Sequence, residues 1–419
     1  MTILLSPPNA AKPATKDPFA VGDGAARKAG IAGWWGHRAI DALGRAFAIG
    51  SITGYLPDGS TRIIGHRDSA GPHATLSILR WRALWKLMQG GSNGWFEAWQ
   101  AGDWSSDDMV TLFAAFSANR RTLGHAGRAR GVLALVQRLG HRVHRNTRAT
   151  ARKNIHAHYD LGNDFYRAWL DQSMTYSSAI DVQDGEELEQ AQRRKIDAAL
   201  DRLNLSTGQT LLEIGCGWGG SARRAIERFG VRYTGLTLSD EQADILRPAI
   251  VPNGEVAIRD YRDQTGQFDA IVSIEMVEAV GQEYWPAYLE TVARLLKPGG
   301  RAAIQYIAID DAIFEAYAAG ADFIQSRIFP GGCLISVSRF REIASRYGLR
   351  WEDQVDFPAG YAETLRRWRS NFDNAVAQAD LPARFDQTFI DLWRYYLMYC
   401  EGGFRGGGLT VAQVTLVKA

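Results

Sequence analysis

The stretch TLLEIGCGWGGSARRAIERFG, residues 210–230, decides the fold of this chain. It starts with a largely apolar run typical of a buried strand and ends with the spacing of an amphipathic helix. The glycines between them allow a tight turn and a close approach to a ligand, which free N–H groups at the helix start could hold. The loop satisfies both GxGxxG and ExGxGxG, so alone it does not distinguish a dinucleotide site, an S-adenosylmethionine site or a ligand-free turn.

Apolar runs and helical stretches alternate on the C-terminal side of this loop. Strands are predicted at 209–215, 232–238, 255–260, 268–274 and 301–309, and helices at 217–230 and 239–250. Such alternation indicates a parallel sheet with helices on both faces. The sequence therefore predicts an α/β, Rossmann-like fold from about residue 205 onward.

Residues 33–119 predict a separate, small α+β domain. A helix is expected at 33–48, strands at 51–56, 61–66 and 74–79, and further helical segments at 80–90 and 104–120. The turn Pro57-Asp58-Gly59 is a hairpin signal. Around this domain we expect a loose leader over 1–32, a basic linker over 120–153 and a C-terminal domain over 154–419.

Charge is distributed unevenly along the chain. The net charge of +2 combines +12 in residues 1–155 with −10 in the remainder, and residues 120–153 hold ten Lys/Arg and no acid. This block suits a polyanionic surface, either anionic lipid headgroups or nucleic acid; a solvated helix face and linker is the alternative.

Cysteine usage and hydropathy exclude several classes of protein. Cys216, Cys333 and Cys400 lack metal-ligand spacing, so we expect neither a zinc site nor a disulfide framework, and a reducing cytoplasm is the natural setting. The N-terminus lacks the pattern of a signal peptide, and no run of 18 apolar residues predicts a membrane span.

Three neighbours of the glycine loop favour S-adenosylmethionine. The tip of the second strand, residues 235–238, carries no acid, which a nicotinamide site would need. Ser239 and Gln242 have the spacing of a capping box for the next helix. Asp260 ends the third strand, where its carboxylate could hold an adenine amino group; an exposed loop acid would look the same.

With FDAIVSI and LLKPGG at the fourth and fifth strands, these features resemble the class I S-adenosylmethionine-dependent methyltransferases. The resemblance implies that the glycine loop cradles the amino-acid part of the cofactor. The cofactor contacts it implies are Tyr176, Glu213, Gly215, Gly217, Thr237, Gln242 and Asp260.

A longer set of motifs resembles the cyclopropane fatty acid synthases. HAHYDLGNDFYRAWLDQSMTYSSAI at 156–180 is followed by EIGCGWGG, TGLTLSDEQ, RDYRD, SIEMVEAVG, RIFPGGCL, FPAGYAETLRRW and YYLMYCEGGFRGG. PDG and GGSNGWFEAWQAGDW resemble the accessory domain of the phospholipid-acting members, so the likeness covers roughly residues 35–415. It implies a seven-stranded, mostly parallel sheet, and methyl transfer to the double bond of an unsaturated acyl chain in a membrane phospholipid, giving a cyclopropane.

In that family a bound bicarbonate is thought to act as the base that closes the ring. The resemblance assigns its holder to Glu278, the backbone amide of Ile307 and Tyr361, with a histidine and a cysteine at two further positions. This sequence has Gln305 in place of the histidine and Ser178 in place of the cysteine. Cys400 lies in another family motif, where a catalytic role and a core role stay equally open.

Glu275 is an additional acid beside this predicted anion site, and Ala279 stands where the family has histidine. A second carboxylate could repel bicarbonate, so the site is either altered or uses a carboxylate directly as base. If the base no longer faces the new methyl group, a hydride shift can precede proton loss. The product would then be a methylene- or methyl-branched chain instead of a cyclopropane.

The substrate implied by the resemblance lies in a bilayer, so we expect reversible contact of the basic segment 120–153 with anionic lipid and a cytoplasmic protein at the inner face of the membrane. Trp81 and Trp85, with Arg82 and Lys86, have the i,i+4 spacing of an amphipathic element at a membrane surface, and helix packing within the small domain explains the tryptophans equally well. A nucleic-acid methyltransferase is disfavoured because no Asn/Asp-Pro-Pro-aromatic motif follows the fourth strand. A non-catalytic lipid-binding protein is disfavoured by the intact glycine loop, and a homodimer stays open.

Overall fold

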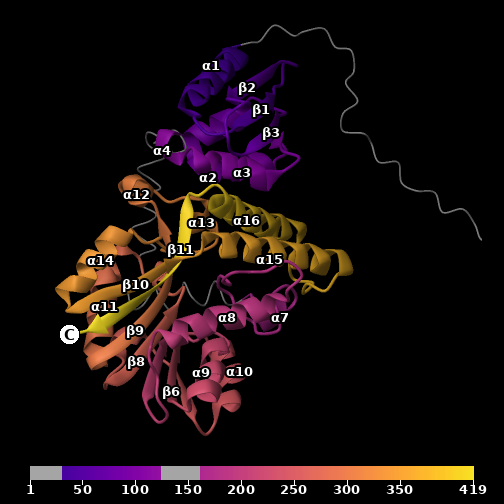
Figure 1. Cartoon of the computed structure of the whole chain (residues 1–419). Helices are drawn as coiled ribbons and strands as arrows, with labels where there is room; N and C mark the ends of the chain where they lie inside the picture. The colour runs from indigo at the N-terminus through magenta and orange to yellow at the C-terminus, as the bar shows by residue number, and fades with distance from the viewer. Residues whose placement is uncertain (1–30, 124–160) are drawn as a thin grey trace, which may run out of the picture.

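The computed structural model describes residues 31–123 and 161–419 (Figure 1). Nearly all of the predicted leader 1–32, most of the basic segment 120–153 and the start of the C-terminal domain lie outside these residues. The boundaries of the three predicted segments therefore stay predictions.

A seven-stranded sheet forms the centre of the larger part of the molecule (Figure 1). Its strands, in the order in which they lie side by side, are β10 (Leu349–Asp356), β11 (Leu409–Lys418), β9 (Leu296–Ile309), β8 (Phe268–Ile274), β5 (Thr210–Ile214), β6 (Arg232–Thr237) and β7 (Gly254–Ile258). Strands β5 to β9 pair in parallel, whereas β11 runs antiparallel to both β9 and β10. The predicted α/β, Rossmann-like sheet of seven mostly parallel strands is confirmed.

Helices cover both faces of this sheet, as the strand–helix alternation predicted. One face packs against α8 (Leu188–Asp201), α9 (Gly220–Phe229) and α10 (Asp240–Ile250). The other packs against α11 (Trp285–Leu295), α12 (Asp311–Ala318) and α14 (Val337–Arg346). Leu211 and Leu212 of β5 point into opposite cores because successive strand residues face opposite sides.

Two predicted boundaries differ from the structure. Helix α9 begins at Gly220 instead of residue 217, because Gly217 and Gly219 have left-handed φ angles of 49° and 87° and still belong to the turn. Strand β9 begins at Leu296, so the segment LKPGG lies within the bounds of the strand that it was expected to precede.

Residues 31–123 form a smaller α+β unit. Its sheet has the order β2 (Thr61–Gly65), β1 (Ser51–Tyr55), β3 (His73–Ile78), β4 (Trp104–Ser105), and its helices are α1 (Ile31–Ala46), α2 (Arg82–Gln100), α3 (Met109–Ala118) and α4 (Arg120–Leu123). The predicted hairpin is present, closed by Leu56 N–H donating to the Ser60 carbonyl at 2.9 Å. The expected helix over 104–120 starts later, at Met109, because Asp108 caps it and residues 104–105 pair with β3.

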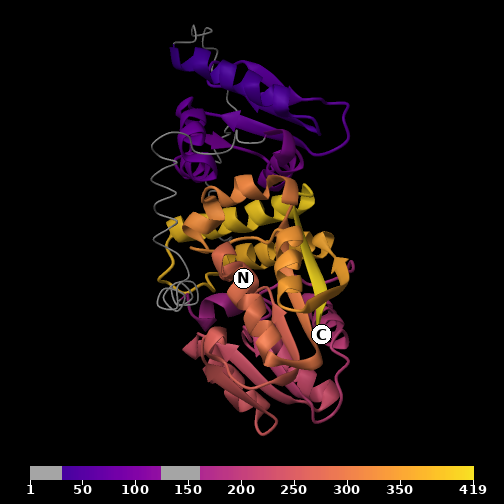
Figure 2. The same cartoon turned by 90° about the vertical axis from the view of Figure 1, so that its left-hand side faces the viewer.

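The smaller unit packs against a helical layer formed by α13 (Phe323–Arg327), α15 (Pro358–Gln378) and α16 (Gln387–Arg405), as Figures 1 and 2 show. The ring of Phe96 lies 4.9 Å from Phe323 and 4.9 Å from Tyr395. Asn93 donates to the Ser326 hydroxyl at 2.9 Å. One continuous apolar core therefore joins the smaller unit to the helices that border the sheet.

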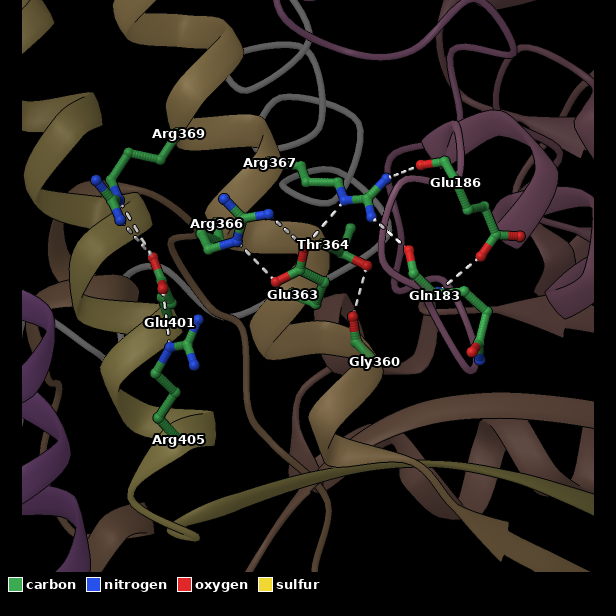
Figure 3. Close-up of polar contacts among 10 residues, drawn as sticks. All are labelled: Gln183, Glu186, Gly360, Glu363, Thr364, Arg366, Arg367, Arg369, Glu401 and Arg405. Atoms are coloured by element: carbon green, nitrogen blue, oxygen red, sulfur yellow. Dashed lines mark hydrogen bonds and ion pairs between the residues drawn. The ribbon is translucent and has the colours of Figure 1, made fainter. Parts of the chain in front are cut away.

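Ion pairs hold α15 in place beside α16 (Figure 3). The buried carboxylate of Glu401 contacts Arg369 at 3.1 Å and Arg405 at 2.9 Å. Arg367 donates to the Gln183 carbonyl at 2.9 Å and to the Glu186 carbonyl. These contacts fix α15 relative to the segment that precedes α8, and both contribute residues to the site described next.

Candidate active site

A cavity of about 200 Å³ lies at the carboxyl ends of β5, β6 and β8. In open α/β sheets, ligands bind outside the carboxyl ends of the strands. All seven residues expected to contact a cofactor line it: Tyr176, Glu213, Gly215, Gly217, Thr237, Gln242 and Asp260. The structure therefore brings together the set that the sequence predicted.

The glycine loop leaves room for a ligand. Gly215 has a φ of 85°, and a Cβ atom there would lie 2.8 Å from the Met276 side chain. A Cβ atom on Gly217 would meet no atom within 4 Å, so the loop faces open space at this point. The loop thus fits the amino-acid part of S-adenosylmethionine, with the N-terminus of α9 beside it.

Glu213 gives this cavity a buried acceptor. Tyr233 donates a hydrogen bond to its carboxylate, and burial raises the pKa of Glu213 to about 7. The ammonium of Lys195, on α8, is fully buried and donates to the Ser177 hydroxyl at 2.5 Å. Burial lowers the pKa of Lys195 to about 8.

Lys195 was missed at the sequence level. It occurs at the spacing of the buried face of α8, between Ala191 and Ala199, and that position was the available signal. Charged residues are rarely fully buried without a partner, so a lysine on an apolar stripe points to a site.

Thr237 and Gln242 interact differently from the predicted capping box. Ser239 caps α10 by accepting from the Gln242 N–H at 3.3 Å. The Gln242 side chain, however, accepts from the Thr237 hydroxyl at 2.7 Å, and Ser239 N–H donates to that same hydroxyl. A full capping box would also need the Gln242 side chain to accept from the Ser239 N–H. That part of the prediction is wrong, because the Thr237 hydroxyl accepts from the Ser239 N–H instead.

Asp260 and Tyr176 both line the cavity. The Asp260 carboxylate pairs with Arg262 at 2.6 Å and is 13% exposed, so it is not an exposed loop acid. The Tyr176 hydroxyl lies 2.8 Å from that of Tyr396, and its ring packs 5.6 Å from Trp169 and 5.3 Å from Trp368. Electron-rich ring faces suit a cavity that holds positive charge.

Glu275 occupies the centre of the predicted anion site. Its Oε1 accepts from the Ser178 N–H at 2.8 Å and from the Gln305 amide at 2.7 Å. Its Oε2 accepts from the Tyr361 hydroxyl at 2.8 Å. Three of the groups assigned by resemblance to an anion therefore already hold a carboxylate that belongs to the chain.

The backbone brings Glu275 into this position. Glu275 follows β8 directly and has a φ of 49°, in the left-handed region that favours glycine. Its N–H donates to the Gln305 carbonyl at 2.8 Å. Strained backbone of this kind persists where surrounding contacts determine it, commonly at functional sites.

Glu278 lies in the 3₁₀ turn η2 (Val277–Ala279). One of its oxygens accepts from the Ile307 N–H, and its Oε2 is buried without a hydrogen-bond partner among the described residues. Burial, together with the nearby charge of Glu275, raises the pKa of Glu278 to about 8. Burial raises the pKa of Glu275 as well, while Lys195 and the three hydrogen bonds of Glu275 lower it.

The remaining predicted residues contribute unequally. The Ser178 hydroxyl donates to the Ala179 carbonyl at 2.8 Å, so its backbone N–H and not its side chain reaches Glu275. Thr364 accepts from Ala179 N–H at 3.1 Å and thereby ties α15 to this segment. Cys400 is half-buried on α16 and is not among the residues that line the cavity.

Glu275 also lines the cavity, whereas its hydrogen-bond partners Ser178, Gln305 and Tyr361 are not among the lining residues. The arrangement can place a negative charge beside a positively charged reactant and can accept a proton. Within 31–123 and 161–419, no group of His, Cys, Asp or Glu has the arrangement of a metal site.

A family model described as mycolic acid cyclopropane synthetase matches residues 146–414. Among curated proteins, the chain is 38% identical over 359 residues to tuberculostearic acid methyltransferase UfaA1 of Mycobacterium tuberculosis, covering 80% of each chain. It is 34% identical over 262 residues to the cyclopropane-fatty-acyl-phospholipid synthase of Escherichia coli K12, covering 62% of this chain and 66% of that protein.

Solved structures of similar sequence have the same fold. The mycolic acid cyclopropane synthase CmaA1, complexed with SAH and CTAB, superposes with a TM-score of 0.60 at 34% identity, over 64% of this chain and 98% of that one. The cyclopropane synthase MmaA2 from Mycobacterium tuberculosis gives 0.59 at 31% identity, over 64% and 98%. With the glycine loop and the cavity that it borders, these matches show that the chain belongs to the cyclopropane synthase family of S-adenosylmethionine-dependent methyltransferases.

Proposed function

We propose that this enzyme methylates the double bond of an unsaturated acyl chain in a membrane phospholipid, and that its product is a methylene- or methyl-branched chain. The observation that carries the proposal is the Glu275 carboxylate inside the cluster of Ser178, Gln305 and Tyr361. A resident carboxylate at this point supplies both a negative charge and a proton acceptor next to the cofactor cavity.

When bound, S-adenosylmethionine supplies an electrophilic methyl group, whose transfer to an alkene leaves positive charge on the acyl chain. The carboxylate of Glu275 stabilises that charge, and the rings around Tyr176 exclude water from it. One proton must then leave the cation, and the free lone pair of Glu275 Oε2 can accept it. The chain gains a net CH₂.

Glu275 makes a separate bicarbonate unnecessary in this proposal. Its carboxylate takes the hydrogen bonds from Ser178, Gln305 and Tyr361 that a bound anion would need. A second anion at the same point would meet the charge of Glu275 at close range, which is unfavourable.

A carboxylate that belongs to the chain also favours branching over ring closure. Burial raises the pKa of Glu275, although its hydrogen bonds oppose that rise, and the three donors hold the carboxylate in one place. A base fixed away from the new methyl group leaves the cation time for a hydride shift, after which loss of a proton leaves a double bond. The name of the relative UfaA1, a methyltransferase, supports this outcome.

A cyclopropane is the second candidate product. Glu278 and the Ile307 N–H are retained in contact, as the family resemblance requires, and several relatives are named cyclopropane synthases. Both products have the same mass, so they differ in whether a double bond remains.

We further propose that the protein works at the inner face of the cytoplasmic membrane. The structure has no helix long and apolar enough to span a membrane within its described residues. All of the basic segment 120–153 beyond residue 123, which suggested lipid contact, lies outside them. Support from the described residues comes from α1 and α2, where Trp34, Trp35, Trp85 and Met88 are exposed.

We call these four exposed residues the tryptophan face. Trp81 packs between the two helices: a Cβ atom on Gly36 would lie 2.2 Å from its ring, and the His37 ring meets it edge-on with ring centroids 5.3 Å apart. Arg38 lies 5.0 Å above the Trp34 ring. Tryptophan flanked by basic residues suits the interface of an anionic bilayer.

The deciding experiment incubates the purified protein with vesicles of monounsaturated phospholipid and S-adenosylmethionine carrying a CD₃ group. A methyl-branched alkene keeps three deuterons, whereas a methylene-branched chain keeps two and retains a double bond detectable by derivatisation. A product with two deuterons and no double bond is the cyclopropane and would overturn the proposed branching.

A further inference from the structure

A second buried glutamine lies behind Gln305. Gln413 of β11 pairs directly opposite Gln305 of β9, and side chains of such a pair share one face of the sheet. Gln413 Nε2 donates to Gln305 Oε1 at 3.0 Å and to the backbone carbonyl of Lys195 at 3.0 Å. Both amides are about 1% exposed, so water cannot substitute for these bonds.

Arg202, at the end of α8, begins this chain of hydrogen bonds. Its Nε donates to Gln413 Oε1 at 3.3 Å, Gln413 donates to Gln305, and Gln305 donates to Glu275 at 2.7 Å. Each bond therefore points from the guanidinium toward the carboxylate. Hydrogen bonds aligned in one direction polarise and strengthen one another.

The direction of the chain is fixed at both ends. The Lys195 carbonyl can only accept and the Arg202 guanidinium can only donate, so Gln413 has one orientation that satisfies both. That orientation presents a donor to Gln305 Oε1 and leaves the Gln305 amide N–H₂ facing Glu275. Reversing either amide would bring two donors or two acceptors together.

We propose that Gln413, with Arg202 behind it, is a positioning residue that keeps Glu275 Oε1 an acceptor and so directs proton uptake to Oε2. Oε1 already receives two hydrogen bonds, from Ser178 N–H and Gln305, and has no place for a proton. Oε2 receives one, from Tyr361, and keeps a lone pair. This inference rests on the proposed role of Glu275 as proton acceptor.

Other charged groups around Glu275 act on the same carboxylate. Lys195 of α8 favours its ionised form, whereas Glu278 of η2 opposes it. Tyr361 of α15 donates to it, and Glu213 of β5 interacts with Lys195. Of these residues Gln413 bonds Lys195, through its backbone carbonyl, and the other link from Gln413 to Glu275 runs through the Gln305 amide.

The test is the isosteric variant Gln413→Glu. An ionised carboxylate at 413 cannot donate to Gln305 Oε1, so the Gln305 amide reverses and presents its carbonyl to Glu275. With methylation of monounsaturated phosphatidylglycerol vesicles as the assay, we expect kcat/KM at pH 7 to fall about tenfold. The acid limb of its pH profile should move up by about one pH unit, because Glu275 then ionises less readily.

Two further variants guard against a folding defect. Arg202→Gln removes the donor at the half-buried end of the chain and should move the acid limb in the same direction by a smaller amount. Thr415→Val alters another buried polar residue of β11 and should leave the pH profile unchanged. The thermal unfolding midpoint gives a second readout: a higher Glu275 pKa makes stability fall more steeply with rising pH in Gln413→Glu.

The outcomes separate this inference from the proposed function. An unchanged pH profile in both Gln413→Glu and Arg202→Gln, with Glu275→Gln inactive, would overturn the role of the amide chain alone. If Gln413→Glu does not fold, the profile of Arg202→Gln decides. Full activity in Glu275→Gln would instead overturn the proposed role of Glu275 itself.

Discussion

The Tyr361 hydroxyl donates to Oε2 of Glu275 at 2.8 Å, joining helix α15 to the loop after β8. Burial, together with the charge of Glu275, raises the pKa of Tyr361 well above its usual value. The phenol therefore stays protonated and remains a donor throughout the physiological range. It stabilises the ionised carboxylate while leaving one lone pair of Oε2 free.

Removing this hydroxyl should slow the reaction without affecting the cofactor. For Tyr361→Phe we expect kcat to fall about tenfold to hundredfold, the usual cost of losing one hydrogen bond at a developing charge. The affinity for S-adenosylmethionine, measured by calorimetry, should stay within about twofold of the wild type. A weakened cofactor affinity would show that Tyr361 supports the cavity and not Glu275.

Removing the Glu275 side chain should create a place for an exogenous anion. Glu275→Gly leaves the donors of Ser178, Gln305 and Tyr361 facing a space of carboxylate size. We expect activity to fall at least about a hundredfold and to recover partly with added bicarbonate or formate. Glu275→Gln, which fills the space, is the matched control and should not recover. Equal recovery in both variants would contradict this account.

Glu278 should make the protein less stable as the pH rises. Its pKa is about 8 in the folded state against an ordinary value of 4.5, so the folded state binds more protons between these values. The free energy of unfolding then falls with rising pH in this window, by at most about 1.4 kcal/mol per pH unit. Urea unfolding at several pH values should show this slope in the wild type and a flatter one in Glu278→Gln.

In Glu278→Gln the free energy of unfolding should still fall somewhat with rising pH. Glu213 and Asp322 cause this remaining slope, because burial raises their pKa values to about 7 and about 6. A slope as steep as in the wild type would mean that Glu278 ionises normally.

Cofactor binding should depend on the ionisation of Glu213. Because its pKa is about 7, this carboxyl group gains a proton as the pH falls below neutral and becomes a weaker acceptor. We expect the affinity for S-adenosylmethionine to decrease from pH 8 to pH 6. Calorimetry across this range should find weaker binding and a smaller pH dependence in Glu213→Gln. Tyr233→Phe, which removes the donor to Glu213, should shift the transition to higher pH.

The tryptophan face should govern binding to lipid. We expect Trp35→Ala and Trp85→Ala, at residues that are each 58% exposed, to weaken sedimentation with anionic vesicles by about threefold to tenfold. Binding of the wild type should also decrease with salt. Val355→Ala alters an exposed apolar residue of β10 and should change nothing. Vesicle binding as strong as that of the wild type in both tryptophan variants would show that the tryptophan face does not bind lipid.

The sequence predicted the sheet and the cavity because their signals are local. The glycine loop at 215–220 and the apolar strands on either side need only nearby residues to be interpreted. The seven expected cofactor contacts were implied by the family resemblance and all line the cavity; Glu213 and Thr237 do so because the carboxyl ends of parallel strands meet at one edge of the sheet.

The arrangement of the anion site could not be predicted, because it depends on contacts between distant segments. Glu275 was expected either to repel an anion or to leave a carboxylate as the base, and its hydrogen bonds to Gln305 and Tyr361 could not be read from the sequence because they depend on its left-handed backbone. Gln413 lies 108 residues from Gln305, and strand register alone places it there. The burial of Lys195 could be predicted only once the buried face of α8 was known.

Glu275 has a φ angle of 49°, so the residue that the proposed reaction needs is also one that lowers the stability of the fold at this position. Any residue other than glycine costs about 1 kcal/mol in this conformation, and a buried carboxylate adds a desolvation cost. Glu275→Gly relieves both costs but leaves the buried donors of Ser178, Gln305 and Tyr361 without an acceptor, which offsets the gain. Engineering of this enzyme for durability should leave position 275 fixed and seek its gains in the helical layer and the smaller unit.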